Sequence, residues 1–228
     1  MIRPVFSLTI LSYALLHAGA AFAHASFVTS TGTAGKSMVA TLNVPHGCED
    51  ANAKQYDSYK VEISIPAEFG GVRPMSAVFG KAGVLKDGNG NVTKLVWTKT
   101  DSDILADDSQ LYQFTFRGTM PGTAFKSVAF TTVQYCRDGS GNELTQTWSG
   151  ADAPTLRTVP GRTPGWNKYI TPVALDLTGA DKSFLSDAQI VWSGKSAWSI
   201  NPLTLGLIQK KGLELKQVPA NTEILVKY

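Results

Sequence analysis

His24 is the residue of this chain whose position most clearly favours metal chemistry. It follows a segment with the features of a secretory leader, namely a short positive start, an apolar stretch over residues 5–16 and a small-x-small run at 21–23. Cleavage after Ala23 would make His24 the first residue of the mature protein. Its α-amino nitrogen and ring Nδ1 would then chelate one ion, and copper(II) most favours such donors. A cut at 18–20 is the alternative, and it would leave His24 inside the chain.

Composition indicates an exported protein without a membrane span. Removing 23 of the 228 residues leaves 205, enough for one large or two small domains. No later stretch approaches the ~20 apolar residues of a membrane helix. The formal charge of +3 falls to about +2 without Arg3, and the basic residues form no run, which argues against a nucleic-acid partner. We expect a periplasmic or secreted protein.

Two cysteines, Cys48 and Cys136, remain after the expected cleavage. In an oxidising compartment, a pair without a leftover thiol usually forms one disulfide. Closing 88 residues of chain would remove ~4–5 kcal/mol of unfolded-state freedom in the chain-entropy model. The bond would also hold the loop with His46 and Glu49 close to a predicted hairpin whose second strand carries Trp148.

Short alternations of apolar and polar residues predict an antiparallel, immunoglobulin-like β-sandwich. The clearest strand patterns are residues 38–44 and 59–65, each of which ends at a proline. The clusters at 87–91 and 138–142 are rich in Asp, Gly and Asn, so each suits a turn between two antiparallel strands. Further strand candidates cover residues 95–98, 111–117 and 127–135.

The pattern changes after residue 157, and we expect a second, smaller unit there. Residues 24–157 form the predicted sandwich, the proline-containing residues 158–164 a connector, and residues 165–228 a small mixed α/β subdomain. An asparagine N-cap, a proline at the first helical position and a glycine stop predict a short helix over residues 201–212.

Taken in order, these motifs resemble the YcnI-like family of secreted copper-binding domains. The resemblance covers about residues 24–156 and leaves the C-terminal subdomain outside it. The matching residues are the cleavage-exposed His24, the Val-Pro-His-Gly-Cys run at 44–48, the strand end at 63–66, and Gln134-Tyr135-Cys136-x-x-Gly139 followed by Trp148.

The resemblance implies a copper(II) site. In that family the N-terminal histidine holds the metal through its amine and imidazole, and a carboxylate and a nearby tryptophan complete the site. His24 and Trp148 match directly. The carboxylate departs from the pattern because a His-Gly-Cys insertion follows the proline here, so Glu49, Asp50 or His46 takes that place, and we favour Glu49.

Each of these residues also has an ordinary structural role open to it. His46 would make a loop hydrogen bond, and Glu49 and Asp50 would be solvated loop charges. Trp148 would pack in the core or on a sheet face, as we expect of the other four tryptophans. The scattered methionines form no thioether cluster for copper(I).

Three functions are compatible with the sequence, and we expect the first. An exported carrier would buffer copper(II) or hand it to a protein partner in copper homeostasis. The start at His24 also resembles secreted copper-resistance carriers of the CopC type, which use a second histidine, here His46. A copper-dependent oxidative enzyme would grip copper between the same two histidines, but no aromatic platform for a substrate and no nucleophile set is evident. A structural or adhesive sandwich would need no metal. We therefore expect a copper chaperone and not an enzyme.

Overall fold

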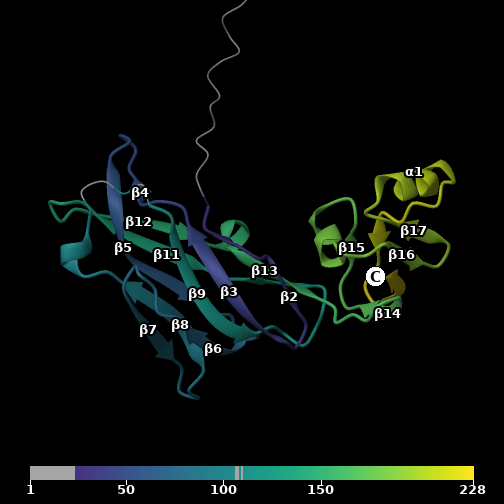
Figure 1. The fold of residues 1–228 in the computed structure, drawn as a ribbon, viewed down its shortest axis with the longest axis horizontal. Coiled ribbons are helices and arrows are strands. Elements are labelled where there is room, and N and C mark those ends of the chain that lie inside the picture. The colour runs from purple at the N-terminus through teal and green to yellow at the C-terminus, as the bar shows by residue number, and fades with distance from the viewer. Residues whose placement is uncertain (1–23, 106–107, 109) are drawn as a thin grey trace, which may run out of the picture.

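Antiparallel strands dominate the protein and form a sandwich followed by a smaller unit (Figure 1). The computed structural model describes residues 24–105, 108 and 110–228. The predicted mainly β, antiparallel sandwich with a small mixed C-terminal subdomain is confirmed. The leader expected over residues 1–23 lies outside the described residues. Within the described ranges, no helix combines the length and apolar character needed to cross a bilayer.

One layer of the sandwich is a four-stranded antiparallel sheet. Alternate side chains of its two central strands are apolar and buried, including Leu42 on one strand and Phe114 on its neighbour. Along the sheet, the strand order is β1 (Ser26–Phe27), β3 (Ser37–Val44), β9 (Tyr112–Thr119) and β6 (Gly70–Pro74).

The second layer is a larger antiparallel sheet that carries both predicted hairpins. The turn clusters at 87–91 and 138–142 join neighbouring strands as expected. Gly90 and Gly141 both have a φ of 83°, a backbone conformation that glycine adopts without steric cost. The strand order is β12 (Glu143–Trp148), β11 (Thr132–Arg137), β5 (Gln55–Ser64), β8 (Val92–Thr98) and β7 (Lys81–Lys86), and the short β4 (Cys48–Glu49) also pairs with β5.

Aromatic rings fill the space between the layers. Phe130 packs edge-on against Phe27 and Phe69, with centroid distances of 5.1 Å in both pairs. A third, smaller sheet has the order β10 (Lys126–Ala129), β13 (Thr155–Val159) and β2 (Thr31–Thr33), and its β2 runs parallel to β13. Two short 3-10 segments, η1 (Asp101–Asp103) and η2 (Gly150–Asp152), complete this part of the chain.

The C-terminal unit has a hydrophobic core of its own, to which Phe125 of the preceding unit also belongs. Its helix starts after Asn201, whose side chain accepts the backbone N–H groups of Leu203 and Thr204, as the capping pattern predicts. The elements are β14 (Trp166–Thr171), β15 (Leu175–Asp176), η3 (Ala180–Leu185), β16 (Ile190–Ser193), β17 (Ser196–Trp198), α1 (Pro202–Lys210), β18 (Gln217–Val218) and β19 (Thr222–Lys227).

Candidate metal centre

The first strand brings His24 next to the loop that follows β3. In the antiparallel β1–β3 pair, Ser26 lies opposite Asn43 and Phe27 lies opposite Leu42. Extending this register by two residues places His24 opposite Pro45. The His24 side chain is exposed, whereas the next residue, Ala25, is buried. The sandwich therefore anchors this end of the chain and leaves the imidazole in solvent.

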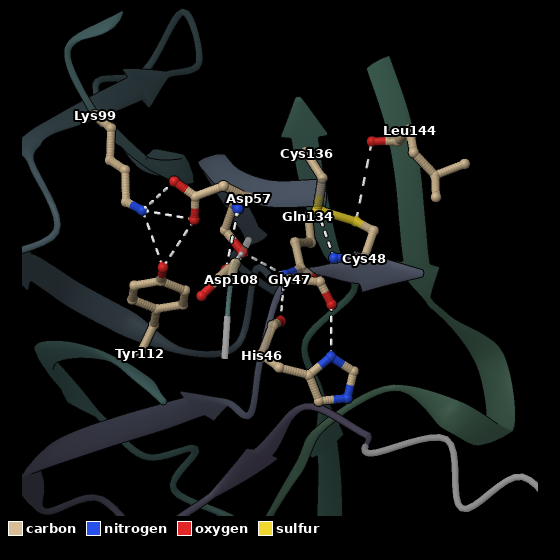
Figure 2. Close-up of a disulfide and its surroundings, with 11 residues drawn as sticks. His46, Gly47, Cys48, Asp57, Lys99, Asp108, Tyr112, Gln134, Cys136 and Leu144 are labelled. Atoms are coloured by element: carbon tan, nitrogen blue, oxygen red, sulfur yellow. Dashed lines mark hydrogen bonds and ion pairs between the residues drawn. A yellow bond between two sulfur atoms is a disulfide. The ribbon is translucent and has the colours of Figure 1, made fainter. Parts of the chain in front are cut away.

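His46, in the same loop, has one ring nitrogen engaged with the backbone. Its Nδ1 lies 2.6 Å from the carbonyl oxygen of Gly47 (Figure 2). Because a carbonyl oxygen only accepts, Nδ1 carries a proton, and in the neutral ring Nε2 holds the lone pair. A backbone acceptor that fixes the tautomer in this way is typical of metal-binding histidines, although a loop histidine without a metal makes the same bond.

A disulfide ties this loop to the second sheet, as predicted. The sulfur atoms of Cys48 and Cys136 are 2.01 Å apart, and the backbone N–H of Cys48 donates to the Cys136 Sγ at 3.1 Å. Gln134, on the same strand as Cys136, donates its Nε2–H to the His46 carbonyl at 2.7 Å. A Cβ added at Gly47 would overlap the carbonyl oxygen of Tyr56. The loop is thus held by a covalent bond, by hydrogen bonds and by close packing.

The two carboxylates after Cys48 have different environments. Glu49 is exposed on β4, and its Oε2 accepts the Nε2–H of Gln55 at 2.5 Å. Asp50 accepts the backbone N–H groups of Lys54 and Asn52, and these bonds hold the pKa of its carboxyl below the ordinary value. Asp50 therefore stabilises the turn between β4 and β5. Glu49 makes fewer hydrogen bonds within the fold, so its carboxylate is the more available of the two.

Trp148 lies at the end of β12, opposite Thr132 on β11. Its side chain is 4% exposed and belongs to the same hydrophobic core as Ala25, the residue that follows His24. Trp148 is therefore chiefly a packing residue of this core. Across the part of the chain that is described, no three His, Cys, Asp or Glu side chains gather closely enough to hold a metal ion. The α-amine that cleavage would expose on His24 is a metal ligand outside that count.

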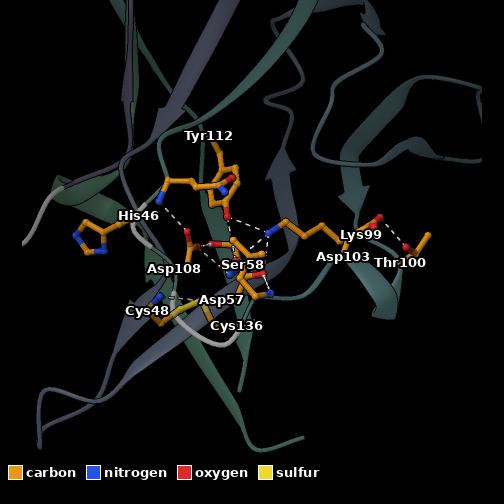
Figure 3. A network of polar contacts seen from close by, with 12 residues as sticks. His46, Cys48, Asp57, Ser58, Lys99, Thr100, Asp103, Asp108, Tyr112 and Cys136 are labelled. Carbon is orange, nitrogen blue, oxygen red and sulfur yellow. Dashed lines mark hydrogen bonds and ion pairs between the residues drawn. A yellow bond between two sulfur atoms is a disulfide. The ribbon is translucent and has the colours of Figure 1, made fainter. Parts of the chain in front are cut away.

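A buried polar cluster lies beyond the disulfide, and sequence reasoning missed it (Figure 3). The Lys99 Nζ donates to both carboxylate oxygens of Asp57 at 2.8 Å and to the Tyr112 hydroxyl at 2.9 Å. The Tyr112 hydroxyl in turn donates to Asp57 at 2.9 Å. Asp108 accepts the backbone N–H and the hydroxyl of Ser58 at 3.2 Å. We call Asp57, Lys99, Asp108 and Tyr112 the buried cluster.

The pKa values of the two carboxylates in the buried cluster are shifted in opposite directions. Burial raises the pKa of Asp57, but hydrogen bonds from Lys99 and the Leu105 N–H outweigh this effect and lower it overall. For Asp108 burial prevails, and its pKa is raised despite the N–H group of Gln110. No alternation marks Asp57 in the sequence, because three consecutive residues, Tyr56, Asp57 and Ser58, are buried and the register with β11 shifts between them and Val61.

Comparisons with known proteins place the chain in a family. Residues 24–157 match the family model described as "Domain of unknown function (DUF1775)". A comparison with curated proteins gave no match. An uncharacterised Nocardia farcinica protein with an immunoglobulin-like fold is 18% identical, with a TM-score of 0.47 over 59% of this chain and 97% of that one. A cohesin module from a Clostridium perfringens family 33 glycoside hydrolase is 15% identical, with a TM-score of 0.33 over 60% of this chain and 98% of the module. Because the family model covers more than half of the sequence, this chain belongs to the DUF1775 family.

Proposed function

We propose that this protein is an exported copper(II) carrier that holds its metal at His24. The observation that supports the proposal is the β1–β3 register, in which Ser26 lies opposite Asn43; continued by two residues, it would set His24 opposite Pro45, where the loop with His46 begins. The disulfide between Cys48 and Cys136 fixes that loop on the sheet. The resemblance of the same motifs to the YcnI-like copper-binding domains supports this assignment.

The donor set fits copper(II) chemically. Once the leader is cleaved after Ala23, the α-amine and Nδ1 of His24 would chelate the ion, and copper(II) favours nitrogen and oxygen donors in a tetragonal arrangement. Glu49 is the preferred third donor because its carboxylate is exposed. The Nε2 of His46 is the alternative. Trp148 would lie beneath the site, as the family resemblance implies.

Acid should release the metal from this site. Both the α-amine and the imidazole must be unprotonated to bind copper. Apparent affinity should therefore fall as the pH is lowered. An exposed carrier site of this kind would be open to a protein partner that accepts copper, within a periplasmic or secreted setting.

The decisive experiment compares the mature protein with a version that has one alanine added before His24. The addition moves the α-amine away from the imidazole and leaves every side chain in place. We expect one tight copper(II) ion per mature chain, measured by competition with a chelator, and a loss of at least tenfold in affinity on addition of the alanine. Equal affinities would contradict the proposal. Mass spectrometry of the exported protein must also give His24 as its first residue.

Three further variants rank the remaining donors. Glu49→Gln should weaken copper binding because it removes a charged oxygen. Asp50→Asn is the matched control on the neighbouring carboxylate, and it should matter less, as should His46→Ala. Electron paramagnetic resonance of the copper complexes reads the donor atoms directly. Loss of a nitrogen signal in His46→Ala alone would show that the histidine, and not Glu49, completes the site.

An oxidative enzyme is the second candidate, and one observation favours it. The hydrogen bond to Gly47 engages Nδ1 of His46 and leaves its Nε2 available as a second imidazole donor. A copper-loaded enzyme would consume a reductant and generate or use peroxide, whereas a carrier would do so only weakly. Reductant-dependent peroxide turnover by the copper complex, lost in His46→Ala, would favour the enzyme.

A further inference from the structure

We propose that Lys99 and Asp57 condense to an intramolecular isopeptide bond within the folded chain. The amine nitrogen of Lys99 lies 2.8 Å from each carboxylate oxygen of Asp57 (Figure 3). A nitrogen equally close to both oxygens lies on the plane that bisects the carboxylate and contains its carbon, the atom that the nitrogen would attack from above the carboxyl plane. Holding two reacting groups at such a distance converts a slow bimolecular reaction into an intramolecular one.

The surroundings of the pair favour an amide over an ion pair. The Lys99 side chain is 6% exposed and that of Asp57 is fully buried. The Lys99 Nζ lies 4.7 Å from the centroid of the Tyr112 ring and 5.2 Å from that of the Phe79 ring. Burying an ammonium and a carboxylate carries a large desolvation penalty, and a neutral amide avoids most of it. The same exclusion of water removes the reactant that would hydrolyse the product.

Neighbouring groups are placed to assist the reaction at Asp57. The Tyr112 hydroxyl donates to Oδ1 at 2.9 Å, and the backbone N–H of Leu105 donates to Oδ2 at 2.6 Å. Both donors would stabilise the negative charge that develops on oxygen when nitrogen adds to the carbon. Asp108 accepts the backbone N–H and the hydroxyl of Ser58, the residue next to Asp57, and its pKa, raised mainly by burial, favours the protonated form that can act as a general acid.

The reaction needs no activating reagent and no oxidant. The Lys99 ammonium loses one proton, its nitrogen adds to the Asp57 carbon, and a second proton leaves the nitrogen as the C–N bond becomes an amide. One carboxyl oxygen departs with these two protons as water. Asp108 lends a proton to the leaving oxygen and regains one from the nitrogen, so it is unchanged at the end. The net charge of the pair is zero before and after.

The bond would brace the region around the candidate metal centre. It would join β5 to the residue that follows β8, and β5 also pairs with the disulfide-linked β4. Ser58, the neighbour of Asp57, accepts the Gln134 side chain that also holds the His46 carbonyl. This inference depends only on the buried cluster and stands whether or not His24 binds copper.

Intact-mass measurement of the exported, denatured protein tests the proposal. We expect the mass of the disulfide-bonded chain less one water molecule. Trypsin should fail to cleave after Lys99, and one cross-linked species should contain Lys99 and Asp57. Wild-type protein at the full mass, with both residues in ordinary peptides, would refute the bond. A cyclised Asp57 also loses one water, but it leaves Lys99 in a separate peptide, and that outcome equally contradicts the proposal.

Three variants test the parts of the chemistry. Lys99→Arg keeps the positive charge but lacks a condensable amine, so it should retain the full mass. Asp57→Asn should condense with loss of ammonia and reach the same final mass as the wild-type product. Asp108→Asn should leave most chains uncondensed, and full condensation in it would refute the proton-transfer role of Asp108. If a variant fails to fold, the wild-type mass and peptide map still decide whether the bond exists.

Discussion

Removal of the disulfide should cost this protein much of its stability. The bond closes 88 residues between Cys48 and Cys136. The chain-entropy relation then gives about 4.5 kcal/mol at 25 °C for the unfolded-state freedom restored by Cys48→Ala/Cys136→Ala. The variant also leaves the Cys48 N–H without the sulfur acceptor it has at 3.1 Å, which adds about 1 kcal/mol. A total of about 5.5 kcal/mol is comparable with the whole stability of many domains.

The proposed isopeptide bond changes this estimate only slightly. A bond between Asp57 and Lys99 lies inside the disulfide loop and shortens its free contour by about half. Because the entropy depends on the logarithm of loop length, the disulfide contribution falls only to about 4 kcal/mol. The prediction therefore holds with or without that second cross-link.

Urea unfolding at 25 °C, followed by tryptophan fluorescence, measures the difference in the free energy of unfolding. Leu144→Ala is the matched control, because Leu144 packs against the disulfide while the substitution leaves the covalent bond intact. We expect it to cost about 1–2 kcal/mol, since the side chain is only partly buried. A double cysteine variant that loses less than about 2 kcal/mol, or no more than the control, would refute the chain-entropy argument. The folded double variant should also bind copper more weakly, because its metal-site loop is no longer pinned.

Three smaller perturbations test other parts of the fold. The pKa of Asp138 is depressed chiefly by the Asn142 side chain, so its stabilisation is present above an unfolded pKa of about 3.9 and is lost below it. In Asp138→Asn, the free energy of unfolding should therefore fall less steeply as the pH is lowered below about 4. Urea unfolding between pH 2 and 7 measures this. Gly118→Ala places a methyl group against the Phe69 ring and should lower the free energy of unfolding by about 1–3 kcal/mol, where an unchanged urea midpoint would contradict the packing. Asn201→Ala removes the cap of α1 and should cost about 1 kcal/mol, read from the thermal midpoint against Asn201→Asp, which retains a capping oxygen.

The predictable parts of the fold are those with a local cause. Hairpin turns at 87–91 and 138–142 follow from Asp, Gly and Asn at positions that need tight turns or positive φ. The α1 helix follows from its asparagine cap and its proline at the first turn. Predicting the disulfide required only an even count of cysteines and the expectation of an oxidising compartment. None of these inferences needs knowledge of which strands become neighbours.

The parallel pairing of β2 with β13 and the buried cluster depend on contacts far apart in sequence. Lys99 and Asp57 are 42 residues apart, and Tyr112 and Asp57 are 55 apart. Nothing in the residues around Lys99 distinguishes it from a solvated lysine at a strand end. Only tertiary packing excludes water from the Lys99 side chain. Without that water, a charged lysine is no longer the ordinary expectation.

The candidate metal centre depends both on local sequence features and on strand pairing. The sequence nominates its residues, but only the fold can bring them together. The leader pattern and the loop residues are local features, so the sequence alone nominates His24, His46 and Glu49. Their meeting place depends on β1, a strand of two residues whose pairing with β3 no propensity could predict. That register, continued by two residues, would set His24 opposite Pro45, while the disulfide holds the same loop from its other end. If cleavage after Ala23 frees the amine of His24, the proposed carrier would gain from this rigid loop, because donors fixed before the ion arrives lose little ordering entropy on binding.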